Sequence, residues 1–341
     1  MLKRSDFNSL YEASVSADAD KLPSIANNQK YSGVNKTALE VKKRLAEKSK
    51  NKGVTVDQIK VEKLISTEIR ILNADFKDDI MSMEAPVFSL SKDPEKNLHE
   101  WTWVSIDGKK SITVIPSIKG RPTIYDKDIL IYIYSCLVQR INDGLPISKT
   151  VKFHVYDYLK AIKSDVGGYE YKRFGDALDR LKGNTIKTDI KSNNIEIVSS
   201  FSLIESYRLE KVGKKIEFAE VTLSDWLFNA VEGLNMLSIS PDYFSLKKPL
   251  ERRLYEIARK HVGNQADFKI RTEYLLCKGG SVGSIKEFKR ILREIIKIDS
   301  TPDYRLRIVG EFTQIYQKDP KKYVAALANR ASKQAVRKNK L

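Results

Sequence analysis

The same order of predicted elements occurs twice in this chain of 341 residues, and that order limits the possible folds more than any other feature. Each copy reads helix, strand, short helix, third helix and then hairpin strands, with turn residues between the elements. The first copy comprises residues 125–144, 149–155, 156–164, 169–183 and 185–224. The second, after a strand expected at 244–248, comprises residues 249–263, 267–271, 272–280, 284–298 and 303–318. This order is that of the winged helix, an elaborated helix-turn-helix.

The predicted fold class is therefore α+β, with two tandem winged-helix (helix-turn-helix) domains, a helical N-terminal extension and a basic C-terminal tail. The extension is expected at residues 1–80, the first domain at 81–222, the second at 223–320 and the tail at 321–341. The extension opens with a polar, aperiodic stretch that is typical of flexible segments. Its two predicted helices lie at 37–50 and 55–72, and the sequence assigns them no role.

The stretch SIKEFKRILREIIKI at residues 284–298 forms the third helix of the second copy and has the clearest charge pattern. Ser284, with Glu287 three residues later, is a capping-box pattern. One apolar stripe at helical spacing comprises Ile285, Phe288, Ile291, Leu292, Ile295 and Ile298. Opposite this stripe, an arc of about 100° holds Lys286, Lys289, Arg290, Arg293 and Lys297. Glu287 and Glu294 lie at its border. A solvated face is the alternative for this ridge, but since ordinary surfaces intersperse both signs, a ridge of one sign favours an anionic partner.

The whole chain is basic, with a formal net charge of +17 and a pI of about 9.5. This charge favours nucleic acid as the partner, and an anionic membrane second. The membrane alternative is weaker because the sequence has no apolar run of about 18 residues and no signal-peptide core at its start. Cys136 and Cys277 lie far apart in apolar stretches, which predicts reduced, buried thiols in a cytoplasmic protein.

The positive charge is concentrated at the end of the chain. From Lys318 to Leu341 there are eight Lys and Arg residues against one Asp, in a segment expected to be helical at most in part. Such a tail is equally compatible with phosphate contacts and with a disordered end that aids solubility.

Six stretches, taken in order, carry a specific family resemblance. They read SMEAPVFSLSK, KGRPTIYDKDILIY, RFGDALDRLKGNTIKT, VTLSDWLFNAV, DYFSLKKPLERRLYEIARKH and IKEFKRILREI, the last followed by PDYRL. Together they span roughly residues 80–310, and this part of the chain resembles the plasmid replication initiator protein A family. The resemblance implies a bacterial, plasmid-encoded protein. By wider similarity among plasmid initiators, it also implies two winged-helix domains that bind direct repeats in double-stranded origin DNA. It says nothing about the N-terminal 80 residues or the tail.

The candidate DNA-binding residues follow from the positions of the cations. The five basic residues of 284–298 are the leading candidates, because the third helix of a winged helix enters the major groove. In the first copy, Lys172 and Arg173 are expected to contact phosphate, while Asp176 and Asp179 neutralise much of that face. The hairpins offer Lys187 and Lys191 in the first copy and Arg305 and Arg307 in the second, for phosphate or minor-groove contacts. Solvated strand charges are nearly as compatible with the hairpin residues.

Three further groups are read mainly as structural. Arg252 is expected to pair with Glu256 at i,i+4, so that Arg252 and Arg253 serve the fold rather than the DNA. Trp101, Trp103 and Trp226 are expected in the core or at an interface. Lys119-Gly120-Arg121, just before a helix, is a weaker candidate for a phosphate contact.

No enzyme signature stands out. GGSVG at 279–283 lacks the GK[ST] of a P-loop, and His99, His154 and His261 are isolated, so no catalytic residue, cofactor or metal site is predicted. The leading hypothesis is a non-enzymatic initiator that binds origin repeats, recruits the host replication initiator and helicase, and regulates its own gene. The resemblance also allows a homodimer. The alternatives are a winged-helix transcriptional regulator on inverted repeats and, third, a nicking enzyme.

Overall fold

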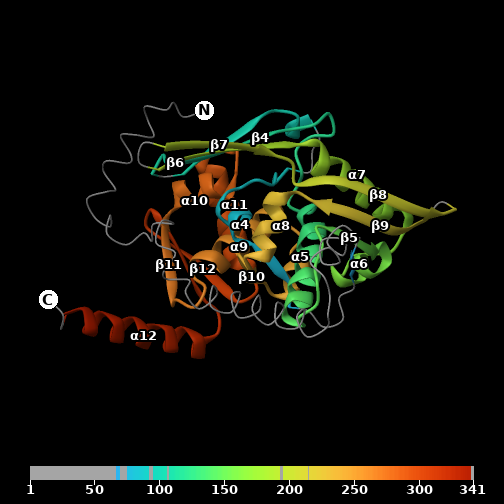
Figure 1. The fold of residues 1–341 in the computed structure, drawn as a ribbon. Helices are drawn as coiled ribbons and strands as arrows, with labels where there is room; N and C mark the ends of the chain where they lie inside the picture. Colours follow the sequence, from blue (N-terminus) through green and yellow to red (C-terminus); the bar gives the residue numbers. More distant parts are fainter. Residues whose placement is uncertain are drawn as a thin grey trace.

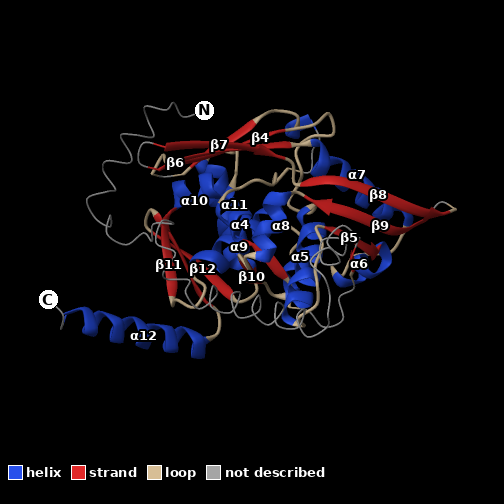
Figure 2. Ribbon diagram, viewed as in Figure 1, coloured by secondary structure: helices blue, strands red, loops and turns tan. Residues whose placement is uncertain are grey.

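The computed structural model describes residues 67–69, 75–91, 95–105, 107–192, 195–213 and 215–338. Figure 1 traces these segments along the sequence, and Figure 2 separates helices from strands. Helices and strands are mixed throughout, which confirms the α+β class. The helix expected at 37–50 lies outside the described residues. The one expected at 55–72 is described only at its end, where Thr67–Glu68 is a strand, β1, and not a helix. The Ile69 N–H donates to the Lys152 carbonyl, and Ile69 is buried, so sheet pairing prevails over helical propensity here.

The first unit is built around helix α5 (Lys127–Asn142), in which every residue from Lys127 to Val138 is buried. Strand β5 (Thr150–His154), α6 (Val155–Ala161) and α7 (Gly168–Gly183) follow. Two long strands, β8 (Ile204–Val212) and β9 (Lys215–Leu223), complete the unit. The sheet has the order β1-β5-β9-β8, with β1 parallel to β5 and the other pairs antiparallel. In Figure 1 the β8–β9 hairpin projects from the body at the right.

A hairpin is inserted between α7 and β8, and here the expectation from the sequence is wrong. Strands β6 (Thr185–Ser192) and β7 (Ile195–Phe201) do not complete the sheet of the first unit. They pair with β3 (Trp101–Val104) and β4 (Lys110–Ile115) in a separate antiparallel sheet of order β3-β4-β6-β7. The hairpin next to β5 is β8–β9. Strand patterns alone give no pairing partner, so the two hairpins could not be distinguished in the sequence.

The second unit repeats the element order without an insertion. Helix α9 (Pro249–His261) leads to β11 (Asp267–Arg271), α10 (Thr272–Gly279) and α11 (Ile285–Ile298). The hairpin of β12 (Tyr304–Val309) and β13 (Phe312–Gln317) turns at Gly310, whose φ is 61°. The sheet order β11-β13-β12 matches β5-β9-β8 in the first unit. In both units, then, the last strand lies between the other two.

The junction of the two units combines the segment that links them with a segment that precedes the first unit in sequence. Helix α8 (Asp225–Glu232) precedes β10 (Met236–Ser238), which pairs with β2 (Lys77–Asp79), and α4 (Ile80–Glu84) then packs on α9. The strand expected at 244–248 is not formed. The Ser240 side chain accepts from the Asp242 N–H and opens a 3-10 helix, η4 (Pro241–Ser245), in its place. Phe244 and Ser245, the first two residues of the predicted strand, belong to η4, and residues 246–248 form the loop before α9.

Two hydrophobic clusters hold the molecule together. One surrounds α5 and β5, with Leu137 and Phe153 fully buried, and the other surrounds α9, with Leu254 and Phe288 at its centre. A short 3-10 helix, η3 (Glu95–Asn97), precedes β3. The tail is a helix, α12 (Pro320–Lys338), and so more helical than expected. Figure 1 shows α12 extending away from the body at the lower left.

Candidate nucleic-acid interface

Helix α11 forms where the sequence predicted it, although the Glu287 side chain pairs with Arg290 and does not complete the predicted capping box. The Ser284 side chain accepts from the Glu287 N–H and caps the first turn. Phe288, Leu292 and Ile295 are buried in the second hydrophobic cluster. Asp299 ends the helix in the left-handed conformation, with φ 52°. One face of α11 is thereby fixed on the core, and the opposite face is free to meet solvent or a partner.

The cationic ridge is defined by the five basic residues of this opposite face. Four of its members are exposed and one is half-buried: Lys286, Arg290, Arg293 and Lys297 are exposed, and Lys289 is half-buried. Within the part of the chain that the structure describes, all but Arg290 lack an acidic partner. Four positive charges thus share one helix face without compensation. This arrangement is unfavourable in isolation and becomes favourable next to a polyanion.

Arg290 differs from the rest of the ridge. Its Nη2 lies 2.6 Å from Glu287 Oε1, its Nε donates to Glu287 Oε2 at 2.9 Å, and its Nη1 pairs with Glu294. The hydrogen bonds that Arg290 donates to Glu287, followed by the charges of Glu287 and Glu294, raise the pKa of Arg290 above its usual value. Arg290 is therefore paired with the two acidic residues at the border of the ridge. The sequence pattern did not reveal this pairing.

The β12–β13 hairpin presents two arginines beside α11. Arg305 and Arg307 are exposed, whereas Leu306 between them is buried, as the alternation predicted. Arg305 Nε lies 3.0 Å from Asp299 Oδ2, at the end of α11. Arg307 donates from Nε to Gln314 Oε1 at 2.8 Å and lies over the Tyr316 ring at 5.5 Å. Both guanidinium groups are held on the outer face of the sheet.

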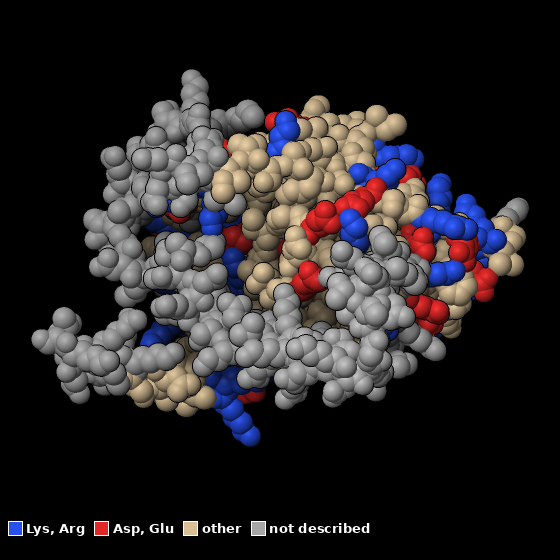
Figure 3. All heavy atoms as spheres, viewed as in Figure 1, with Lys and Arg blue, Asp and Glu red and all other residues tan. Residues whose placement is uncertain are grey.

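In the first unit, the corresponding helix α7 has compensated charges. Lys172 and Arg173 are exposed as predicted, but Arg173 Nη1 lies 2.7 Å from Glu170 Oε2. Arg180 Nε lies 2.8 Å from Asp126 Oδ2, and Tyr207 on β8 donates to Asp179. Figure 3 shows the same trend more broadly, since Lys, Arg, Asp and Glu side chains are intermixed over the first unit at the right of the view. The charges on this face are neutralised, but not by the expected residues: Glu170 and Asp126 pair with Arg173 and Arg180 in place of Asp176 and Asp179.

The hairpin residues of the first unit need reassignment. Lys187 on β6 is exposed, and the side chain of Lys191 lies outside the described part of the structure. Both belong to the inserted hairpin and not to the β8–β9 hairpin that lies beside β5. The sequence reading overlooked three exposed cations on β8–β9, namely Arg208, Lys211 and Lys215. Arg208, between Tyr207 and Leu209, shows the same alternation that singled out Arg305 and Arg307, whereas Lys211 and Lys215 flank the turn at Gly213.

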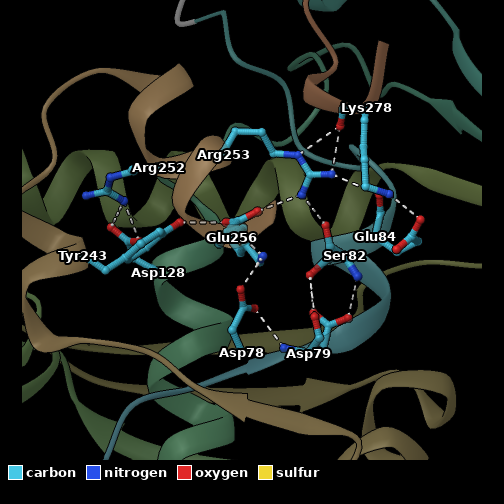
Figure 4. Close-up of polar contacts among 11 residues, drawn as sticks. Asp78, Asp79, Ser82, Glu84, Asp128, Tyr243, Arg252, Arg253, Glu256 and Lys278 are labelled. Carbon is cyan, nitrogen blue, oxygen red and sulfur yellow. Dashed lines mark hydrogen bonds and ion pairs between the residues drawn. The ribbon is translucent and has the colours of Figure 1, made fainter. Parts of the chain in front are cut away.

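Charged residues also meet in the interior, in a cluster between the two units (Figure 4). Lys127 Nζ of α5 lies 2.7 Å from Asp78 Oδ2 and 3.0 Å from Glu256 Oε1 of α9. Against the lowering effect of burial, these carboxylates raise the pKa of Lys127. Arg252 Nη1 of α9 reaches Asp128 Oδ1 of α5 at 2.7 Å. These contacts join α5 of the first unit to α9 of the second.

Arg253 is the most extensively bonded side chain of this cluster. It is 2% exposed, and its Nη1 lies 2.9 Å from Glu256 Oε2. It also donates to the backbone carbonyls of Ser82, Glu84 and Lys278, which come from α4 and α10. The predicted i,i+4 pair of Arg252 with Glu256 is therefore wrong, because Asp128 captures Arg252 from another element. The structural role predicted for both arginines is consistent with their burial, which removes them from the candidate interface.

Three other kinds of feature among the described residues could indicate a different function: metal ligands, membrane-spanning helices and exposed tryptophans. Among the described residues there is no group of three or more His, Cys, Asp or Glu side chains arranged to hold a metal ion. In the same part of the chain, no helix combines the length and the apolar character needed to cross a membrane. Trp103 is buried, and Trp101 and Trp226 are half-buried, with Trp226 stacked on Phe201 at 4.6 Å between ring centroids.

Comparisons with known proteins agree on one class. Residues 77–306 match the family model described as replication initiator protein A. A putative replication protein of Wigglesworthia glossinidia brevipalpis is 40% identical over 249 residues, which cover 71% of this chain and 88% of that protein. A crystal structure of domains 2 and 3 of RctB covers 70% of this chain and 98% of its own, with a TM-score of 0.53 at 13% identity. This last similarity concerns the fold alone.

Taken with the mixed α+β fold, these matches place the chain in the class of replication initiators. Because the family model spans most of the chain and the 40% identical relative is covered over most of its length, the assignment can be made at the level of a family. The chain belongs to the replication initiator protein A family. The resemblance read from the sequence is thereby confirmed.

Proposed function

We propose that this initiator binds repeated sites in double-stranded DNA at a plasmid origin, with α11 as the helix that reads the major groove. The observation that carries the proposal is the set of four ridge cations that have no acidic partner among the described residues. Lysine and arginine can bind guanine O6 and N7 or phosphate oxygens. A net charge of +17 supports the same partner.

The proposal treats both units as winged helices in tandem. The shared element order and the matching sheet orders β5-β9-β8 and β11-β13-β12 support it. In this arrangement β12–β13 is the wing of the second unit, where Arg305 and Arg307 meet the DNA backbone or the minor groove. The wing of the first unit is β8–β9, and its helix α7 makes weaker contacts through Lys172 and Arg173.

At the origin, the bound initiator recruits the host replication initiator and helicase, and it represses its own gene by binding nearby sites. We propose that it does this without catalysis or a cofactor. These steps follow from the family and not from any geometry of the site. Nicking of supercoiled plasmid by the purified protein would contradict the non-enzymatic role. Binding to inverted repeats alone would favour a transcriptional regulator instead.

A salt-titrated binding assay tests the proposal. A duplex taken from upstream of the protein's own gene is compared with a scrambled duplex, using wild type and the double variant Lys286→Ala/Arg293→Ala. The wild type is expected to prefer the native duplex, and the double variant to lose about 2–6 kcal/mol of that preference, at about 1–3 kcal/mol for each base contact. Lys109→Ala is the control, because Lys109 is an exposed lysine of the β3–β4 turn. Equal binding of both duplexes by the wild type would contradict base reading by α11.

A further inference from the structure

The turn before α5 contains a buried arginine that no carboxylate among the described residues neutralises. Arg121 is 6% exposed, and its Nε is fully buried without a hydrogen-bond partner. Nη1 and Nη2 have no partner either among the described residues, but unlike Nε they are not fully buried. The guanidinium group is thus buried at Nε, while its two terminal nitrogens retain some exposure to solvent.

The charge of Arg121 persists in spite of its burial. Burial lowers its pKa to about 10, so the group remains protonated at neutral pH. The nearest compensation is the Trp101 ring, whose centroid lies 5.2 Å from the guanidinium carbon. A buried charge normally requires an ion pair or hydrogen-bond partners. A cation–π contact stabilises the charge far less than these do. All the buried arginines of the cluster between the units, by contrast, have carboxylate partners.

The backbone around Arg121 is held firmly. Its N–H donates to the Asn97 carbonyl at 2.9 Å, and the next residue, Pro122, accepts from the Ser89 N–H at 2.8 Å. Before it, Ser117 and Gly120 form a tight turn, with Gly120 at φ 84°. A fixed backbone keeps the guanidinium group oriented before any ligand arrives, which reduces the entropic cost of binding.

The same turn presents a second cation at the surface. Lys119 is exposed, has no acidic partner among the described residues, and donates its N–H to Ser117 Oγ. Two cations on one turn, one buried and one exposed, suit an anion that binds at the surface of this turn and remains partly solvated. Arginine binds phosphate oxygens with two parallel N–H groups, and lysine adds a point charge.

We propose that Arg121 and Lys119 form a binding site for a phosphate group of the DNA backbone, separate from the cationic ridge of α11. The inference rests on the proposed DNA binding and adds a contact from outside both third helices. DNA is favoured over an acidic protein surface because the whole chain has a net charge of +17 and because the site offers donors for a single compact anion. Phosphate contacts position the protein on the duplex but do not read its sequence.

A buried charge with no partner gives the proposal a distinctive test. In Arg121→Met, an apolar side chain replaces the uncompensated charge, so the free protein is expected to melt at the same or a higher temperature than wild type. The same variant is expected to bind native and scrambled duplexes several-fold more weakly, with the preference between them unchanged. The slope of log affinity against log salt is expected to decrease by about 1.

Further variants keep the test decisive. Lys119→Ala changes only an exposed side chain and is expected to reduce the salt slope by about 1, while Lys109→Ala, which removes an equal charge from another exposed turn, leaves the slope unchanged. Loss of the native preference in the α11 double variant, with no change in Arg121→Met or Lys119→Ala, would overturn this inference and leave the proposed function intact. A lower melting temperature with unaltered DNA binding would instead assign Arg121 to packing on Trp101. A higher melting temperature with unaltered DNA binding would assign the Arg121 and Lys119 turn to an anion other than DNA, and either result would overturn the proposal.

Discussion

The cluster between the two units and the ridge on α11 use the same kinds of residue in opposite ways. In the cluster, Arg252, Arg253 and Lys127 are buried, and each has at least one carboxylate within 3.0 Å. On the ridge, the basic side chains other than Arg290 have no acidic partner among the described residues. Charge alone therefore does not identify a functional residue in this chain. The presence or absence of a partner distinguishes the ridge from the cluster, and an uncompensated cation gains most from an anion that arrives later.

The same distinction separates the two third helices. On α7, Arg173 and Arg180 are both paired, whereas on α11 only Arg290 is. The second unit is thus better suited to bind a polyanion, and the first unit is better suited to support it through the cluster. We therefore expect substitutions in the cluster to change the stability of the protein and substitutions on the ridge to change DNA binding.

The largest effect is expected from a matched pair of arginine substitutions. Arg253→Met would leave Glu256 without this partner and three carbonyls without a donor, at a cost of about 3–5 kcal/mol in the free energy of unfolding. Arg293→Met changes an exposed residue of the same type and is expected to alter stability by no more than about 0.5 kcal/mol. Urea unfolding followed by circular dichroism measures both. Equal effects of the two substitutions would remove the distinction between cluster and ridge.

A second effect, in acid, is expected from Glu84 at the edge of the cluster. Glu84 forms ion pairs with Lys260 and Lys278, and His261 Nε2 lies 3.4 Å from its carboxylate without forming a hydrogen bond. Burial acts to raise the pKa of Glu84, but the adjacent His261 imidazole and the charges of Lys278 and Lys260 outweigh it and hold the pKa well below its usual range. Glu84→Gln removes the counter-charge of both lysines and is expected to cost about 1.5–3 kcal/mol at neutral pH.

The pH dependence follows from the direction of two shifts. The stabilisation by Glu84 is complete above its unfolded pKa of about 4.3 and is lost as the pH falls below that value. Burial also lowers the pKa of His261 to about 4, so protonation of His261 opposes folding as the pH falls from about 6.5 towards 4. The wild type should therefore lose stability below about pH 6.5, and His261→Gln should flatten the curve between about pH 6.5 and 4. Melting temperatures of wild type and His261→Gln across this pH range measure the effect. A curve in His261→Gln identical to that of the wild type would contradict the lowered pKa of His261.

Local features of the fold could be predicted from the sequence, and pairings between distant elements could not. Helix α11, with its Ser284 cap, its buried Phe288 and its exposed basic face, follows from spacing alone. The two hairpins after α7 have similar strand patterns, so their sheets were indistinguishable until the pairing was known. Arg252 was assigned to Glu256 because both lie on one helix, while its true partner, Asp128, is 124 residues away. The lack of a partner for Arg121 is likewise a property of the folded chain, invisible in a list of residues.

The smallest and sharpest prediction concerns two arginines on the same ridge. Arg293 has no acidic partner among the described residues, so Arg293→Ala should weaken binding to the native duplex by about 1–3 kcal/mol if it contacts a base. Arg290 must first release Glu287 and Glu294 before it can meet DNA, so Arg290→Ala is expected to cost less. Glu287→Gln/Glu294→Gln frees Arg290 without changing its side chain and is expected to strengthen binding and steepen the salt dependence, because two negative charges leave the interface. Fluorescence anisotropy with the native and scrambled duplexes measures all three. If Arg290→Ala weakens binding as much as Arg293→Ala does, the ion pairs with Glu287 and Glu294 do not keep Arg290 from the DNA. Pairing in the free protein would then not indicate which cations on this helix contact DNA.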